Sequence, residues 1–105
     1  MTIARRTLRA GGRAVPLLAG PGALAEVPSA LAELSFEGHL FVVADQHAID
    51  LHQHALRDAL PDAPVLCVSG NEEDKTLDAV TRVWDWLVER GVQRRDALLA
   101  FGGGV

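Results

Sequence analysis

The sequence predicts an α/β fold, a Rossmann-like and mostly parallel sheet preceded by an N-terminal β-hairpin. Three short apolar runs, residues 39–44, 65–68 and 97–101, have the length and composition of buried strands. Two stretches with apolar residues at helical spacing, residues 46–60 and 76–90, separate them. A strict alternation of strands and helices builds βαβ units, whose strands run parallel and whose crossovers are right-handed.

The N-terminal region has the pattern of a hairpin followed by a short helix. Two extended runs, Thr2–Arg9 and Arg13–Ala19, are joined by a Gly-Gly pair that can adopt the positive φ of a tight hairpin turn. We expect this hairpin at the edge of the parallel sheet. Pro28 fits the first turn of the helix that follows, because proline is tolerated there and disrupts a helix interior.

Three of the predicted elements carry specific expectations about burial. The run 97–101 lacks the alternation of a half-exposed strand, which predicts a strand covered on both faces. Helix 46–60 should direct Ile49, Leu56 and Leu60 inward. For helix 76–90 we expect one buried face made of Leu77, Val80, Trp84, Leu87 and Val88.

Composition excludes several classes of partner. Ten basic and fourteen acidic residues give a net charge of −4, and no run of Lys or Arg exceeds two, which argues against nucleic acid. The apolar stretch Val15–Ala25 is interrupted by Pro and Gly and is shorter than the roughly 20 residues that span a bilayer, so no membrane partner is expected. The single cysteine, Cys67, fits a reducing cytoplasm and a place in the core.

Histidine spacing argues against a metal site. Positions 47, 52 and 54 are five and two residues apart, whereas two ligands on one helical face need a spacing of three or four. We therefore expect no metal ligands in this chain. His52 should be partly buried beside Ile49 and Leu56, and His54 should be exposed.

Candidate ligand-binding residues follow each predicted strand of the parallel sheet, and parallel strands bring these positions to one edge. Asp45 ends the first strand. There a carboxylate can accept hydrogen bonds from both hydroxyls of a ribose. Alternatively, it can cap the N-terminus of the next helix. Glu72 and Lys75 follow the second strand. Their side chains could bind a sugar or a phosphate, or they could belong to a solvated acidic first turn of the next helix.

Three glycines, Gly102 to Gly104, follow the third strand. Without side chains they let a ligand approach the main chain, so that backbone N–H groups can point at phosphate oxygens. A tight strand-to-helix connection is the alternative. The spacing lacks the full dinucleotide-binding fingerprint, so the glycines alone do not decide between the two.

Several motifs occur in an order that resembles the N-terminal NAD-binding domain of the 3-dehydroquinate synthase family. These are the segment Val42–His47, the pattern Glu72-x-x-Lys75-Thr76-Leu77, Trp84 in a long helix, and Leu99–Val105. The segment Val15–Gly22 is similar to that family's opening strand and turn. The resemblance extends over nearly the whole chain, and the ordered combination is more specific than any single motif.

The resemblance implies which residues bind NAD. Asp45, Glu72 and Lys75 would hold the adenosine end, and the backbone of the glycine turn would approach the diphosphate. Two positions depart from the family pattern: asparagine is usual where His47 stands, and glycine is usual where Asn71 stands. The complete set of implied cofactor-binding residues is Asp45, His47, Asn71, Glu72, Lys75, Gly102, Gly103, Gly104 and Val105.

The resemblance also implies an activity. Such enzymes are carbon-oxygen lyases of the shikimate pathway of aromatic amino acid biosynthesis. They convert 3-deoxy-arabino-heptulosonate 7-phosphate to 3-dehydroquinate and release phosphate. NAD acts as a transient oxidant, and a divalent metal, zinc or cobalt, is bound in a C-terminal helical domain that this sequence lacks.

Residues 1–105 are therefore expected to form one domain, the first part of a longer two-domain cytoplasmic enzyme, and to be inactive without the C-terminal catalytic domain. The resemblance is also compatible with a homodimer. Three alternatives stay open: another sugar-phosphate cyclase of the 2-epi-5-epi-valiolone or 2-deoxy-scyllo-inosose synthase type, an NAD- and metal-dependent polyol dehydrogenase, and a non-catalytic α/β module.

Overall fold

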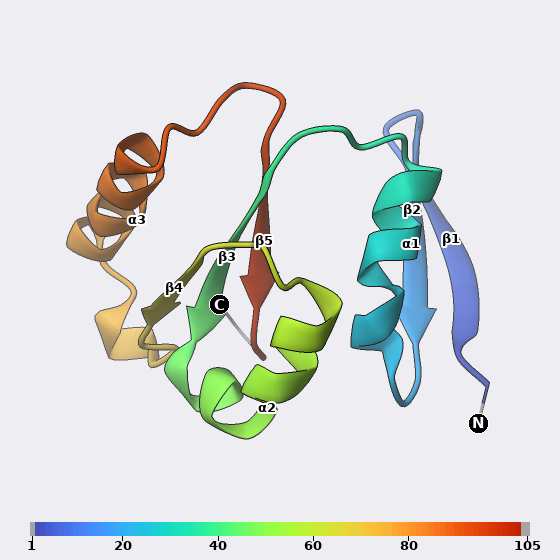
Figure 1. Cartoon of the computed structure of the whole chain (residues 1–105), viewed down its shortest axis with the longest axis horizontal. Helices are drawn as coiled ribbons and strands as arrows, with labels where there is room; N and C mark the ends of the chain where they lie inside the picture. Colours follow the sequence, from blue (N-terminus) through green and yellow to red (C-terminus); the bar gives the residue numbers. More distant parts are fainter. Residues whose placement is uncertain (1, 104–105) are drawn as a thin grey trace. The chain divides into compact units, whose positions relative to one another are not determined.

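A computed structural model describes residues 2–103, which form two compact units divided between Phe36 and Glu37 (Figure 1). The chain contains the predicted hairpin and helices and a sheet of three parallel strands. The α/β prediction is confirmed. None of the described helices is both long and apolar enough to cross a membrane.

The first unit is a hairpin with a short helix. Strands β1 (Ala4–Ala10) and β2 (Arg13–Ala19) pair antiparallel, and they are followed by a 3-10 turn, η1 (Ala23–Glu26), and by α1 (Val27–Glu33). The helix has a proline in its first turn, as predicted. The guanidinium of Arg5 on β1 donates to both carboxylate oxygens of Glu33 on α1, at 2.7 and 3.1 Å.

One expectation about the hairpin is wrong. Strands β1 and β2 form a two-stranded sheet of their own and do not extend the edge of the parallel sheet. The physical reason is local, because the chain leads from β2 through η1 into α1, and the Arg5–Glu33 ion pair joins β1 to that helix.

The second unit contains the parallel sheet. Its elements are β3 (Leu40–Asp45), α2 (Gln46–Ala59), β4 (Val65–Val68), the 3-10 turn η2 (Glu72–Asp74), α3 (Leu77–Glu89) and β5 (Ala97–Phe101). The strand order is β4-β3-β5, and both pairings are parallel. Residues 41–44 of the central strand are buried and form the middle of the core.

The two long helices cover opposite faces of this sheet. Leu56 on α2 lines a cavity together with Val65 and Cys67 of β4. On the other face, the ring of Trp86 on α3 meets the ring of Phe41 edge to face, with centroids 5.9 Å apart. From β3 the chain passes through α2 to β4 on one side, and from β4 it passes through α3 to β5 on the other side of β3. The direction of winding therefore reverses at β3.

The outer strand β5 differs from its prediction. Its side chains alternate between half-buried and exposed, and Leu98 is 51% exposed. Leu98 lies opposite Phe41 in register, so it shares the sheet face that α3 covers. Within residues 2–103, α3 shields β3 and β4 on this face and leaves Leu98 uncovered. The apolar run therefore does not indicate a strand covered on both sides here.

Helix α3 packs through a different face from the one predicted. Val83, Trp86 and Leu87 are half-buried, whereas Trp84 is 60% exposed. Of the expected buried face only Leu87 is covered, and the other four residues are exposed: Leu77, Val80, Trp84 and Val88. The helix carries two apolar stripes at helical spacing, and periodicity alone does not say which one meets the sheet.

Candidate functional site

The carboxyl ends of the three parallel strands form one edge of the sheet. Asp45 at the end of β3 lies opposite Val68 at the end of β4, and Ala44 lies opposite Phe101 at the end of β5. The loops that begin after these residues therefore leave the same edge, as the sequence predicts. In open α/β sheets, ligands bind outside the carboxyl ends of the strands, where the winding reverses.

Asp45 stands between β3 and α2 with a half-buried side chain. It occupies the N-cap position of α2 in an extended conformation, with φ −65° and ψ 130°. Among the described residues, its side chain accepts no capping hydrogen bond from that helix. The carboxylate lies instead against the main chain of Gly70, where an added Cβ would be 2.6 Å from Oδ1. The capping interpretation therefore lacks the hydrogen bond that defines it.

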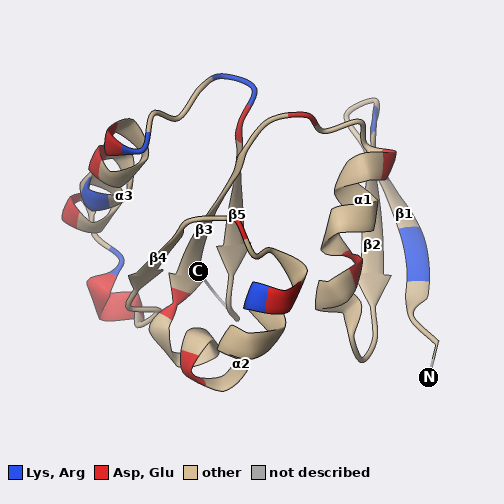
Figure 2. Cartoon of the chain, in the orientation of Figure 1, with Lys and Arg blue, Asp and Glu red and all other residues tan. Residues whose placement is uncertain are grey.

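The loop after β4 is ordered by its own side chains. The Ser69 hydroxyl donates to Oδ2 of Asp74 at 2.6 Å and accepts the backbone N–H of Asn71 at 3.3 Å. The acidic turn η2 follows, and Figure 2 shows it as a red segment between β4 and α3. The Lys75 ammonium donates to Oε1 of Glu72 at 2.7 Å. Both side chains are exposed, and an exposed pair of this kind contributes only about 0–1 kcal/mol, so it is free to exchange partners.

Two pockets adjoin this loop. A pocket of about 410 Å³ is lined by Asp45, His47, Asn71 and Arg82, among others. A second pocket of about 670 Å³ is lined by Lys75 and by apolar side chains of α3. Val68 and Ser69 line both pockets, so they are neighbours. The structure brings Asp45, His47 and Asn71 to one pocket and Lys75 to the next. Glu72 lines neither pocket and is linked to the second one only through its ion pair with Lys75.

Sequence reasoning missed most of the residues that line the first pocket, among them Gly70 and Arg82. Arg82 lies in the middle of α3, where a charged residue ordinarily indicates a solvated position. It reaches the pocket only because α3 crosses the sheet beside the end of β4. The sequence contains no signal from which this could have been deduced.

The glycine turn begins directly after β5. Gly102 has a φ of 150°, a conformation that residues with a side chain rarely adopt. An added Cβ at Gly103 would meet no heavy atom within 4 Å, so the main chain there borders open space. Both residues are exposed and can be approached by a ligand. Gly104 and Val105 lie outside the described residues.

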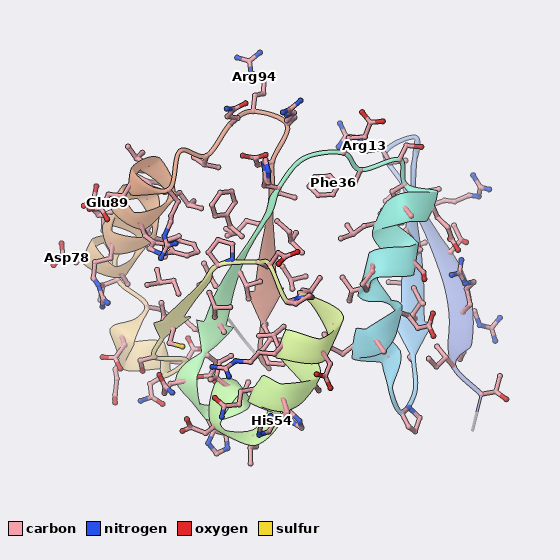
Figure 3. All side chains as sticks on the ribbon, in the orientation of Figure 1. Arg13, Phe36, His54, Asp78, Glu89 and Arg94 are labelled. Atoms are coloured by element: carbon pink, nitrogen blue, oxygen red, sulfur yellow. The ribbon has the colours of Figure 1, made fainter. Side chains whose placement is uncertain are left out.

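The structure does not offer a metal centre in its described part. Residues 2–103 contain no group of three or more His, Cys, Asp or Glu side chains placed to hold a metal ion. His54 is exposed and points away from the sheet (Figure 3). His52 is exposed too, contrary to the expected partial burial, because the backbone of α2 is non-helical at this residue, with φ −131°. The side chains present therefore do not fit a divalent metal.

Comparison with known proteins shows similarity to one family. Residues 65–105 match the family described as 3-dehydroquinate synthase N-terminal. The chain is 37% identical over 103 residues to a 3-dehydroquinate synthase of Listeria monocytogenes, an alignment that covers 94% of this chain and 28% of that protein. It is 35% identical over 99 residues to a 3-dehydroquinate synthase of Ruegeria pomeroyi, an alignment that covers 90% of this chain and 27% of that protein. By sequence, the chain is similar to the N-terminal part of 3-dehydroquinate synthases.

A solved structure supports the fold. The chain has a TM-score of 0.75 to the crystal structure of 2-deoxy-scyllo-inosose synthase, with 24% identity over 90% of this chain and 28% of that one. The segment that matches the 3-dehydroquinate synthase N-terminal family runs from β4 through the glycine turn, and so contains two of the three loops at the sheet edge. The chain spans less than a third of the length of these curated relatives.

Proposed function

We propose that this chain is the NAD-binding portion of a 3-dehydroquinate synthase. The reaction would convert 3-deoxy-arabino-heptulosonate 7-phosphate to 3-dehydroquinate with release of phosphate. Similarity to proteins named 3-dehydroquinate synthase supports the proposal. The structural observation that carries it is the parallel register of β3, β4 and β5, which gathers the three loops at one sheet edge.

The residues at this edge have the chemistry that a dinucleotide needs. A carboxylate such as that of Asp45 can accept hydrogen bonds from both hydroxyls of a ribose, and these bonds are stronger than neutral ones. The Lys75 ammonium can leave Glu72 and neutralise a phosphate. The uncovered main chain at Gly102 and Gly103 allows a diphosphate to approach backbone N–H groups.

Bound NAD would supply a reversible hydride acceptor at this site. The chain's own part is to bind and orient the cofactor, because its candidate residues contact the adenosine and diphosphate and none is proposed to react. The divalent metal ion implied by the family, zinc or cobalt, would be held by residues of a C-terminal helical domain. We also infer that residues 1–105 alone do not catalyse the reaction.

NAD titration and product analysis test this function. The full-length natural protein should bind NAD in a calorimetric titration and should release phosphate and 3-dehydroquinate from the seven-carbon substrate. Phosphate release from another sugar phosphate instead would assign it to a different cyclase. Accumulation of NADH in proportion to turnover would identify a polyol dehydrogenase, because a cyclase restores its cofactor in every cycle. Absence of NAD binding would indicate a non-catalytic module.

A further inference from the structure

We propose that Gly70 is a positioning residue that keeps the Asp45 carboxylate in the orientation needed to receive a ribose. The inference rests on the proposed NAD site and adds a residue to it. Gly70 itself is not proposed to contact the ligand. Its role is to carry no side chain, so that the Asp45 carboxylate can occupy the space beside its main chain.

The distances around Gly70 show how closely the carboxylate approaches. An ideal Cβ at this position would lie 2.6 Å from Oδ1, 2.8 Å from Cγ and 3.3 Å from Oδ2 of Asp45. Ordinary van der Waals contact of a Cβ begins near 3.4 Å. All three atoms of the carboxyl group thus stand where a side chain at residue 70 would have to be. The two residues come together because Asp45 pairs in register with Val68, two positions before Gly70.

Backbone conformation does not explain the glycine. The φ of Gly70 lies outside the range from +20° to +160° in which only glycine is comfortable, unlike that of Gly102. Alanine can therefore adopt the local backbone conformation at residue 70. The atoms that it would displace belong to the end of one side chain, which can rotate away. We expect Gly70→Ala to fold and to move the Asp45 carboxylate.

Displacement of this carboxylate should affect ligand binding more than folding. The Asp45 side chain makes no capping hydrogen bond to α2, so the helix loses none when the carboxylate moves. The same carboxylate lines the pocket that also contains His47, Asn71 and Arg82. A ligand hydroxyl in this pocket would lose the acceptor that the glycine keeps in place.

A double-mutant cycle on the full-length natural protein tests the proposal. The dissociation constant for NAD is measured by calorimetry for the wild type, Gly70→Ala, Asp45→Ala and the double variant. We expect Gly70→Ala to weaken binding about tenfold, the loss of one charge-assisted hydrogen bond. In the Asp45→Ala background the same substitution should change affinity by less than about twofold, because the group that it displaces is absent.

A second readout separates orientation of the carboxylate from a general loosening of the loop. The wild type should bind NAD more tightly than the analogue that lacks the 2′-hydroxyl of the adenosine ribose. Gly70→Ala should reduce this preference, which a merely structural change would leave intact. The control is Glu73→Ala, an exposed position in the same loop, which should preserve both affinity and preference.

The outcomes are distinguishable. Absence of NAD binding by the wild type overturns both the proposed function and the role of Gly70. Normal binding by the wild type with unchanged affinity in Gly70→Ala, or equal losses in both backgrounds, overturns only the role of Gly70. If Gly70→Ala is too unstable to titrate, Asp45→Ala should restore its melting temperature by removing the overlap. A double variant that stays equally unstable also contradicts the proposal.

Discussion

Oδ1 of Asp96 accepts the backbone N–H of His39 at 2.8 Å, which joins the residue before β5 to the residue before β3. Oδ2 accepts the backbone N–H of Gln93 at 2.7 Å. The next rung is a main-chain bond from the Ala97 N–H to the His39 carbonyl at 3.0 Å. The Asp96 side chain is only 2% exposed, so it extends the pairing of the two strands by one step at the edge opposite to the ligand loops.

Asp96 should make the stability of the folded protein depend on pH in the acidic range. Its pKa is lowered from the ordinary value of 3.8, first by the His39 N–H and second by the Gln93 N–H. A carboxyl group whose pKa is lower in the folded protein contributes its full stabilisation above the unfolded value and loses it as the pH falls through the folded value. Wild-type melting temperature should therefore fall more steeply below about pH 4 than that of Asp96→Ala, and Asp96→Ala should melt lower at neutral pH.

The control for this comparison is Asp62→Ala, an exposed carboxylate in the loop after α2. It should keep the pH profile of the wild type. Glu33 contributes acid sensitivity of its own, because the hydrogen bond from Arg5 lowers its pKa, and this part should remain in both variants. Parallel melting curves for wild type and Asp96→Ala between neutral and acidic pH would contradict the assignment.

Two helix N-caps should respond differently to alanine. Thr76 caps α3 through its Oγ1, which accepts the Ala79 N–H at 3.2 Å, whereas Asp45 makes no such bond to α2. We expect Thr76→Ala to lower the free energy of unfolding by about 1 kcal/mol. Asp45→Ala should lower it by less and should weaken NAD binding about tenfold. Chemical denaturation measures the free energy of unfolding, and calorimetry measures NAD affinity. A loss of stability in Asp45→Ala with unchanged NAD affinity would restore the capping interpretation.

Lys75 should contribute to cofactor affinity through its charge. Lys75→Gln is expected to weaken NAD binding about tenfold and to reduce its dependence on salt, because one phosphate loses a cationic partner. The melting temperature should change little, since the pair with Glu72 is exposed. Titration at low and at physiological ionic strength measures this. If Lys75→Arg fails to retain the salt dependence that Lys75→Gln loses, charge is not the cause.

Leu56 should contribute to the stability of the fold and not to NAD binding. It is 3% exposed and lines a cavity together with Val65 and Cys67 on the α2 face of the sheet. Leu56→Ala should lower the free energy of unfolding by about 2–5 kcal/mol. Leu51→Ala, on the same helix but exposed, should stay within about 0.5 kcal/mol. Denaturant titration measures both, and NAD affinity well below the melting temperature should be the same in the two variants.

Most of the chain's local structure could be predicted because its signals are local. The bounds of β2 and β4 follow from apolar runs and the breaks on either side of them, and the helix beginning near Pro28 follows from the fixed φ of proline. The common edge of Asp45, the Glu72 loop and the glycine turn could be deduced as well. Successive βαβ units make strands parallel, and parallel strands end together.

The sequence by itself determined which segments are strands and helices, and that its candidate ligand residues leave the sheet at one edge. Only the tertiary structure decided which of two apolar stripes of α3 meets the sheet, that β1 and β2 pair with each other in a separate two-stranded sheet, and that Gly70 makes room for Asp45. Periodicity and turn chemistry act within a few residues, so they are readable along the chain. Contacts between α3, β3 and the loop after β4 depend on where each crossover places its helix, which no short stretch of residues specifies.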